Sequence, residues 1–182
     1  MAKTEYLLHR EVEHVLAALM TPNRLVCQVM LHTGLRVDDV LSITAEQARM
    51  PRFWVTEKKT GKRRIVGLPE PLRREIVRCC CPDRRRSPWA FPGVDPAKHR
   101  TRQAVWKDVK RAARLFRLEQ NVAPHSFRKV YAVDLLDRYG DMAKVKRALN
   151  HGNFEVTMIY AMADKLLREK KGQKAAYVGR RL

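Results

Sequence analysis

Apolar residues at the spacing of an α-helix are the feature that most constrains the fold of this chain. From Glu5 to Met20 they recur at helical spacing, and the pattern ends at Thr21-Pro22. A second helix is expected from about Asn23, a suitable N-cap, to Gly34, because glycine suits the residue after a helix. The spacing predicts a mainly helical fold in which each helix buries one face.

Two short runs interrupt the helical pattern and predict a small sheet. Phe53-Trp54-Val55-Thr56 and Arg64-Ile65-Val66-Gly67-Leu68 are rich in β-branched and aromatic residues, and a Lys-Thr-Gly turn lies between them. Two such runs joined by a short turn favour an antiparallel hairpin, here a basic one. We therefore expect an α+β fold, mainly helical, with one small antiparallel sheet.

The rest of the chain is expected to be mostly helical. Further helices are predicted from Val37 to Ile43, from Pro69 to about Cys80, from the cap Thr101 to Phe116, and at about 124–138, 142–149 and 154–169. The proline-rich, basic stretch from Pro82 to Pro96 is the expected mobile loop. We expect Trp54, Trp89 and Trp106 to anchor the core or a loop rather than to stack on bases.

The size and charge of the chain limit the classes of function. Its 182 residues, 45% of them apolar, fit a single domain over residues 1–182 with a hydrophobic core. The 38 Lys and Arg residues against 19 acidic ones give a formal charge of +19, which favours nucleic acid as a partner over a membrane surface. No apolar run approaches the ~20 residues of a membrane span, and the N-terminus lacks the apolar core of a signal peptide. A cytoplasmic protein is expected.

Cysteine spacing argues against a disulfide framework and against a zinc site. Cys27 is isolated, and Cys79-Cys80-Cys81 are consecutive. We interpret the triple cysteine as the end of a helix, whereas the alternative, a redox-sensitive patch, finds no support in the adjacent residues. No metal and no cofactor are expected.

The side chains best suited to chemistry are concentrated near the C-terminus. His125-Ser-Phe-Arg128, His151 and Tyr160 supply two imidazoles, a guanidinium and a phenol, and Arg36 adds a second guanidinium. Two arginines grip one phosphate well, because each offers a planar fork of donors that matches phosphate oxygens. His125 precedes Arg128 by three residues, so on a helix both side chains project from one face. A nearby tyrosine could then attack the held phosphate.

In order and spacing, these residues resemble the catalytic set of the tyrosine recombinases, the phage integrase family: Arg36, Lys59, His125, Arg128, His151 and Tyr160. Thr33-Gly34-Leu35-Arg36 is similar to the first-arginine motif of that family, and Leu149-Asn150-His151 is similar to its third box. The chain departs from the family pattern at Asn150, commonly a glycine, and at Lys129, frequently a histidine. The resemblance spans roughly residues 5 to 170. It implies a recombinase catalytic-domain fold and cleavage and rejoining of double-stranded DNA through a 3′-phosphotyrosine, without metal or nucleotide.

The resemblance also implies roles by position. Arg36 and Arg128 would clamp the non-bridging oxygens of the phosphate, and Lys59 would protonate the departing oxygen. Lys58 is the alternative to Lys59. Asp39 stands where an acid usually supports the first arginine, with a solvent-facing charge as the alternative reading.

Other basic residues are expected to contact DNA. They lie on the hairpin, ahead of the cationic helix, and after the second arginine: Lys58, Lys62, Arg63, Arg64, His99, Arg100, Arg102 and Lys129. A merely solvated run of charge is the alternative for those near residues 98–117. Family members pass a C-terminal segment to a neighbouring subunit, so the resemblance implies exchange of about residues 161–182 and a homo-oligomer, a tetramer on paired sites. A separate N-terminal domain, common in the family, is not expected in this chain.

Two other functions fit the same residues. A type IB topoisomerase or a hairpin-forming resolvase would use this chemistry for another outcome. A catalytically silent DNA-binding regulator would need the charge but not the complete set of six groups.

Overall fold

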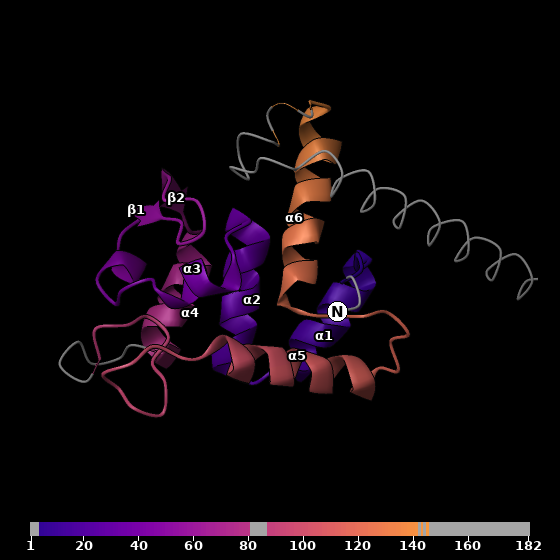
Figure 1. Ribbon diagram of the computed structural model, residues 1–182, viewed down its shortest axis with the longest axis horizontal. Helices are drawn as coiled ribbons and strands as arrows, with labels where there is room; N and C mark the ends of the chain where they lie inside the picture. Colours follow the sequence, from indigo (N-terminus) through magenta and orange to yellow (C-terminus); the bar gives the residue numbers. More distant parts are fainter. Residues whose placement is uncertain (1–3, 81–86, 142, 144, 146–182) are drawn as a thin grey trace, which may run out of the picture.

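The computed structural model describes residues 4–80, 87–141, 143 and 145. Its centre is helix α2 (Thr21–Thr33), which packs against five other helices. These are α1 (His9–Ala18), α3 (Val37–Leu41), α4 (Glu70–Cys80), α5 (Arg102–Leu115) and α6 (Pro124–Tyr139). In Figure 1, α5 runs along the lower edge of the molecule and α6 rises from it, while a small hairpin lies on the far side of α2. The expected fold class, mainly helical with one small antiparallel sheet, is confirmed.

The first two helices begin at residues other than those expected. α1 starts at His9, and Leu7 is fully buried in the extended segment before it. Thr21-Pro22 opens α2 instead of merely ending α1, because proline lacks only an N–H that the first helical turn leaves unused. Asn23 is therefore not a cap. It is buried within α2, where its amide donates to Asp108 of α5 at 2.7 Å.

The predicted hairpin is present as β1 (Arg52–Thr56) and β2 (Arg63–Gly67), which pair antiparallel. Alternate residues of β1 face the core, as expected for a sheet with one covered face. Trp54 pairs with Ile65 on the outer face, where both are about half exposed. The expectation that Trp54 anchors the core is therefore wrong, since its ring lies on the solvent side with the Arg63 guanidinium 5.0 Å from its centroid.

The connection between α4 and α5 is packed over the part that the structure describes. Ala90 donates to the Ile43 carbonyl at 2.9 Å, and Ala45 donates to the Pro88 carbonyl at 2.8 Å. Phe91 is fully buried. These contacts contradict the expectation of a mobile loop for residues 87–96, while residues 81–86 lie outside the described part.

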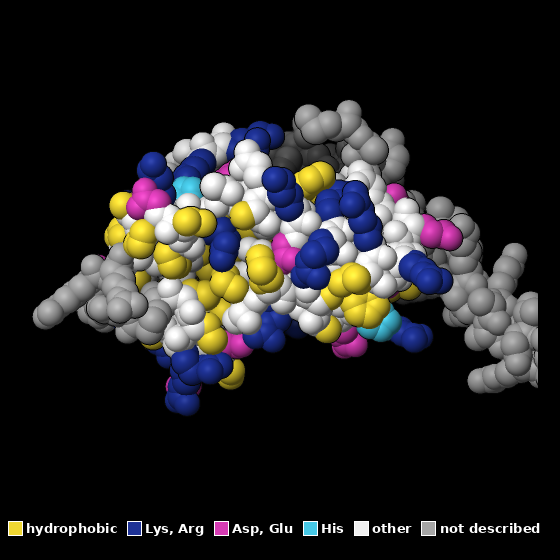
Figure 2. All heavy atoms as spheres, turned by 90° about the horizontal axis from the view of Figure 1, so that it is seen from below, with side chains coloured by type: hydrophobic (Ala, Val, Ile, Leu, Met, Phe, Trp, Pro, Cys, Tyr) yellow, Lys and Arg dark blue, Asp and Glu magenta, His cyan; other side chains and the backbone are white. Residues whose placement is uncertain are grey.

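Helix α5 is amphipathic as predicted. Thr101 caps it by accepting from the Ala104 amide at 3.1 Å, and its buried side is made of Val105, Val109, Ala112 and Ala113. Trp106 is about half exposed on the other side, with the Lys110 ammonium 5.6 Å from its ring, so it is no core anchor. Figure 2, seen from below, shows Lys and Arg side chains spread over this face of the molecule.

Of the helix predicted at 142–149, the structure describes Ala143 and Val145, and both are helical. The helix predicted at 154–169 lies outside the described residues. Within the described part, no helix is both long and apolar enough to cross a bilayer. Cys79 and Cys80 end α4, in agreement with the interpretation of the cysteine run as a helix end, and Cys81 is not described.

Candidate active site

The C-terminal end of α2 is where the arginines of the site gather. The last carbonyls of a helix lack partners within it, and the helix dipole makes this end negative. Arg64 donates to the Thr33 carbonyl at 2.8 Å, and Arg128 donates to the Gly34 carbonyl. Gly34 adopts the left-handed conformation with φ 63°, as predicted for a residue that ends a helix. Arg36 lies two residues after Gly34, as the N-cap residue of α3.

Arg128 is buried close to Arg36. Burial, followed by the positive charge of Arg36, lowers the pKa of Arg128 to about 10. Two guanidinium groups held in this way are stabilised by an anion between them. A phosphate diester carries the required charge, and its oxygens match the donor forks of both arginines.

Glu57, which sequence reasoning missed, joins two of these arginines. Its side chain is 0% exposed, and it accepts a hydrogen bond from Arg36 Nη1 at 2.5 Å. Its other carboxylate oxygen lies 3.3 Å from Arg64 Nε. The alternation of β1 carried a signal for it: Phe53 and Val55 face inward, so the next inward position is Glu57.

Asp39 connects α3 to the hairpin. It is 1% exposed, and its carboxylate accepts a hydrogen bond from the Lys58 backbone amide at 2.9 Å. A solvent-facing charge, the alternative interpretation of Asp39, does not agree with this burial. Within the turn that carries Lys58 and Lys59, the Gly61 amide donates to the Glu57 carbonyl at 2.8 Å.

A cavity of about 740 Å³ brings together three of the four described residues of the predicted catalytic set. It is lined by Arg36, Asp39, Lys58, Lys59 and His125, and by Met30, Val37, Asp38 and Arg102. His125 is exposed in the first turn of α6, and Arg128 lies one turn further along the same helix. Both lysines reach the cavity, so its geometry leaves the choice between Lys58 and Lys59 open.

Two members of the predicted catalytic set, His151 and Tyr160, lie outside the described residues. The predicted exchanged segment 161–182 lies there as well. Among the residues that are described, no group of three or more His, Cys, Asp or Glu is placed to hold a metal ion.

The residues predicted to bind DNA fall into different environments. Lys62 and Arg63 are exposed on the hairpin, and Arg102 lines the cavity with Nη1 3.8 Å from Asp38. His99 is held in its loop, since its Nδ1 lies 2.8 Å from the Arg100 carbonyl. Its ring also packs edge-on against the indole of Trp89, which makes Trp89 the loop anchor that was expected.

Two of the predicted DNA contacts are structural instead. Lys129 is 3% exposed, and its ammonium donates to the Thr4 carbonyl, so it fastens the N-terminal segment to α6. Arg64 is largely buried between Glu57 and the end of α2. Side chains committed to such contacts inside the fold are not positioned to bind the DNA backbone.

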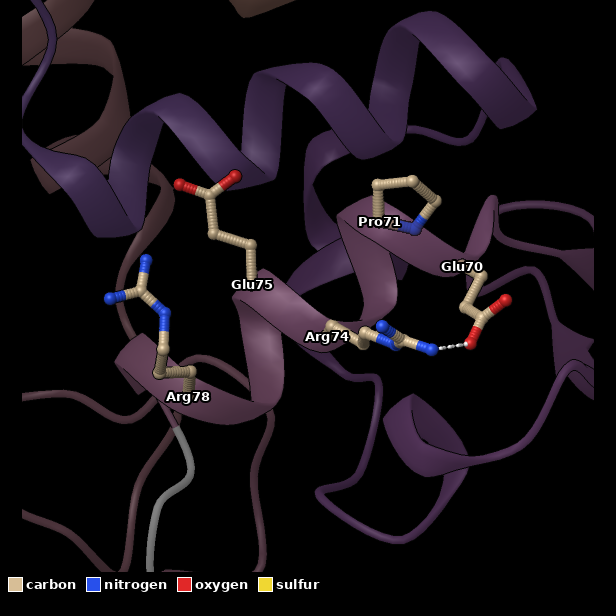
Figure 3. A pocket seen from close by; sticks show the side chains of 5 residues that line it. All are labelled: Glu70, Pro71, Arg74, Glu75 and Arg78. Atoms are coloured by element: carbon tan, nitrogen blue, oxygen red, sulfur yellow. Dashed lines mark hydrogen bonds and ion pairs between the residues drawn. The ribbon is translucent and has the colours of Figure 1, made fainter.

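A second hollow, of about 550 Å³, lies along α4 and contains none of the predicted residues. It is lined by Glu70, Pro71, Arg74, Glu75 and Arg78, which Figure 3 shows as sticks. Arg74 pairs with Glu70, and Glu75 pairs with Arg24 of α2 at 2.5 Å. Its acids are thus matched by neighbouring bases.

Comparisons with known proteins point to one family. Residues 5–166 match the family model described as phage integrase family. The chain is 28% identical to the probable integrase/recombinase YoeC of Bacillus subtilis (strain 168) over 135 residues, which cover 74% of each chain. It is 30% identical to the tyrosine recombinase XerD of Brucella suis biovar 1 (strain 1330) over 140 residues.

The match with XerD covers 73% of this chain and 45% of XerD, so the chain spans just under half the length of that relative. Among solved structures, the XerH site-specific recombinase in its post-cleavage complex with the palindromic difH substrate has a TM-score of 0.70 at 20% identity. That alignment covers 93% of this chain and 52% of XerH, and it establishes a shared fold. Because the family model matches residues 5–166, nearly the whole sequence, the chain belongs to the phage integrase family.

Proposed function

We propose that this chain is the catalytic domain of a site-specific DNA recombinase, which cleaves and rejoins DNA strands through a covalent 3′-phosphotyrosine. The observation that carries this proposal is the cavity in which Arg36, Lys59 and His125 meet, with Arg128 anchored beside it. Family membership and the names of YoeC and XerD support it.

The proposed reaction is a phosphoryl transfer that requires no metal. Arg36 and Arg128 bind the non-bridging oxygens and stabilise the charge that develops on them. The Tyr160 oxygen attacks phosphorus as its hydroxyl proton passes to one of the two histidines, and the bond from phosphorus to the 5′ oxygen breaks. Lys59 gives its proton to that oxygen, while His125 and His151 assist by hydrogen bonding and proton transfer. Attack of a 5′ hydroxyl on the phosphotyrosine reverses these steps and rejoins a strand.

Double-stranded DNA is the proposed partner. The formal charge of +19 and the cationic outer side of α5 provide the attraction to phosphate. A lambda integrase tetramer bound to a Holliday junction has the same fold, with a TM-score of 0.64 at 16% identity. We propose a tetramer on paired sites for this chain too, with the segment 161–182 exchanged between subunits, acting on DNA in the cytoplasm.

Covalent capture on a DNA library tests the proposal. The protein is incubated in EDTA with duplexes that carry a nick near a randomised centre. Cleavage next to the nick releases a short fragment with a 5′ hydroxyl, and without this fragment the strand cannot be rejoined, so the adduct is trapped. The wild type is expected to form a denaturation-resistant adduct whose sequencing reveals the preferred site. Tyr160→Phe is expected to form none while still binding DNA, because only the nucleophilic oxygen is removed.

The same DNA separates the alternatives. Exchange between two copies of the captured site supports a recombinase, whereas relaxation of a supercoiled plasmid without exchange favours a topoisomerase. A wild-type chain that binds DNA and forms no adduct would be a silent regulator. An adduct that requires Mg²⁺ would contradict the metal-independent mechanism.

A further inference from the structure

We propose that Glu57 is a positioning residue that holds the Arg36 guanidinium in the orientation in which it meets the scissile phosphate. The inference rests on the proposed function, because it assigns Glu57 a part in that same site. Glu57 is not one of the groups taken from the family pattern, and the mechanism above gives it no step.

The contact between Glu57 and Arg36 is short and lies inside the protein. Glu57 Oε2 is 2.5 Å from Arg36 Nη1, the Glu57 side chain is 0% exposed, and the Arg36 side chain is 16% exposed. A guanidinium has five N–H donors in a rigid plane, so a bond that holds one edge fixes the direction of the others. Arg36 also lines the cavity, and its fixed plane therefore faces the place where phosphate binds.

Arg64 in turn holds the Glu57 carboxylate in place. Arg64 Nε lies 3.3 Å from its second carboxylate oxygen, and Arg64 Nη2 donates to the Thr33 carbonyl at the end of α2. A connected chain of contacts thus runs from α2 through Arg64 and Glu57 to Arg36. Orientation by a neighbour that cannot itself move is the condition for a preorganised site.

Stability alone is a weak explanation for a carboxylate at this position. Removing a carboxylate from water is costly, and buried ion pairs often contribute no more to folding than apolar residues of similar volume. The negative charge does have a local use, since Arg36, Arg64 and Arg128 would otherwise repel one another: the attraction of Glu57 acts on both Arg64 and Arg128. Its loss is expected to let the guanidinium groups move apart.

The test compares two substitutions of the same kind in two pairs of the same length. Glu57→Gln removes the negative charge beside Arg36, and Glu75→Gln removes the one beside Arg24. The Arg24–Glu75 pair is also 2.5 Å long, but its glutamate lines the α4 hollow. Single-turnover cleavage is measured at saturating DNA, with affinity measured separately. Glu57→Gln should cleave ~10–100-fold more slowly, because small misplacements of a catalytic group have effects of this size, with a dissociation constant within about threefold of wild type. Glu75→Gln should match wild type in both.

Glu57→Asp keeps the charge but lacks one methylene, so cleavage between wild type and Glu57→Gln is expected. This variant also provides the test if the Glu57→Gln protein does not fold. Cleavage at the wild-type rate in a folded Glu57→Gln, or in Glu57→Asp if Glu57→Gln does not fold, would overturn the proposal.

A double-substitution cycle separates positioning from a general structural role. If Glu57 acts through Arg36, adding Glu57→Gln to Arg36→Ala should produce no further loss of cleavage. A further loss as large as in the wild-type background would mean that Glu57 acts elsewhere, and the proposal would be wrong.

A measurement without catalysis distinguishes failure of this inference from failure of the proposed function. In protein with ¹⁵N-labelled arginine, the Arg36 Nη–Hη signals, assigned by their loss in Arg36→Lys, should report slow guanidinium rotation in wild type and fast rotation in Glu57→Gln. A restrained Arg36 in a wild-type chain that never cleaves DNA would uphold the contact and reject the recombinase. Equal mobility in both proteins would reject the role of Glu57 even if cleavage is normal.

Discussion

Two arginine–glutamate pairs of equal length lie in different surroundings. Arg24 and Glu75 meet at 2.5 Å between α2 and α4, where their side chains are 34% and 29% exposed. Arg36 and Glu57 meet at the same distance beside the cavity, at 16% and 0%. Water screens the first pair more than the second. The same contact is therefore expected to be a minor stabilising interaction in one region and a constraint on a reactive group in the other.

The two hollows also differ in their balance of basic and acidic residues. Along α4, Glu70 and Glu75 are each paired with a base, and Figure 3 shows the contact between Glu70 and Arg74. The cavity beside α3 is instead lined by five basic residues against two acidic ones: Arg36, Lys58, Lys59, Arg102 and His125 against Asp38 and Asp39. A surplus of donors, rather than the volume of a hollow, makes a phosphate site.

Removing the arginine of each pair should have very different effects on DNA cleavage. Arg36→Ala should slow DNA cleavage by ~10³-fold, because a preorganised donor to the developing charge is lost. Arg24→Ala should leave cleavage within about twofold of wild type, because its pair lies outside the cavity. Single-turnover cleavage of the captured substrate measures both. Equal effects of the two substitutions would mean that the cavity is not the reactive site.

The two lysines of the cavity are expected to differ in their part in the reaction. Lys59→Ala should slow cleavage by ~10²-fold, the size expected when a general acid is lost. A substrate with sulfur in place of the bridging 5′ oxygen should restore the rate, because a thiolate leaves without a proton. Lys58→Ala should be less impaired and should gain less from the sulfur.

Rates of both variants on the two substrates decide this assignment. Rescue of Lys58→Ala, with no rescue of Lys59→Ala, would transfer the proton-donating role to Lys58. No rescue of either would place the acid on another residue.

Much of this architecture was predictable because it depends on short stretches of chain. The hairpin follows from alternating β-branched residues around a turn, and Gly34 follows from the conformation that a helix end requires. The spacing of His125 and Arg128 holds because both lie on one helix. The family pattern also predicts two residues that line the cavity, Arg36 and Lys59, although Lys58 lines it as well.

The failures involve partners that are distant in sequence. The sequence favours Asn23 as a cap, whereas its amide donates to Asp108, and it favours Lys129 as a DNA contact, whereas its ammonium donates to the Thr4 carbonyl. Nothing near these residues in the sequence identifies such partners. Glu57 differs, since the alternation of β1 places it inward, and an acid at an inward position requires a basic partner.

Exposed arginines of the two hollows offer a third test. Arg102 lines the cavity with its side chain 65% exposed, and Arg74 lies in the α4 hollow at 77%. If Arg102 binds a DNA phosphate, Arg102→Ala should reduce the slope of log affinity against log salt by ~0.9. Arg74→Ala should leave the slope unchanged, since Arg74 pairs with Glu70. Affinities from about 50 to 200 mM salt measure both slopes. A change confined to Arg74→Ala would mean that DNA binds the face that carries α4 and not the cavity.

The smallest expected effect lies in the Arg24–Glu75 pair itself. Double-alanine cycles followed by denaturant unfolding give the coupling energy of each pair. For Arg24 with Glu75 we expect about 0.2–1 kcal/mol, because exposed pairs are screened and must order two long side chains. This coupling should nearly vanish in 1 M salt, where the screening length falls to about 3 Å. The coupling of Arg36 with Glu57 should change little with salt, because ions do not reach a carboxylate that is 0% exposed. Equal salt dependence of the two pairs would mean that Glu57 is as hydrated as Glu75, and the difference between the two regions would then lie in their position alone.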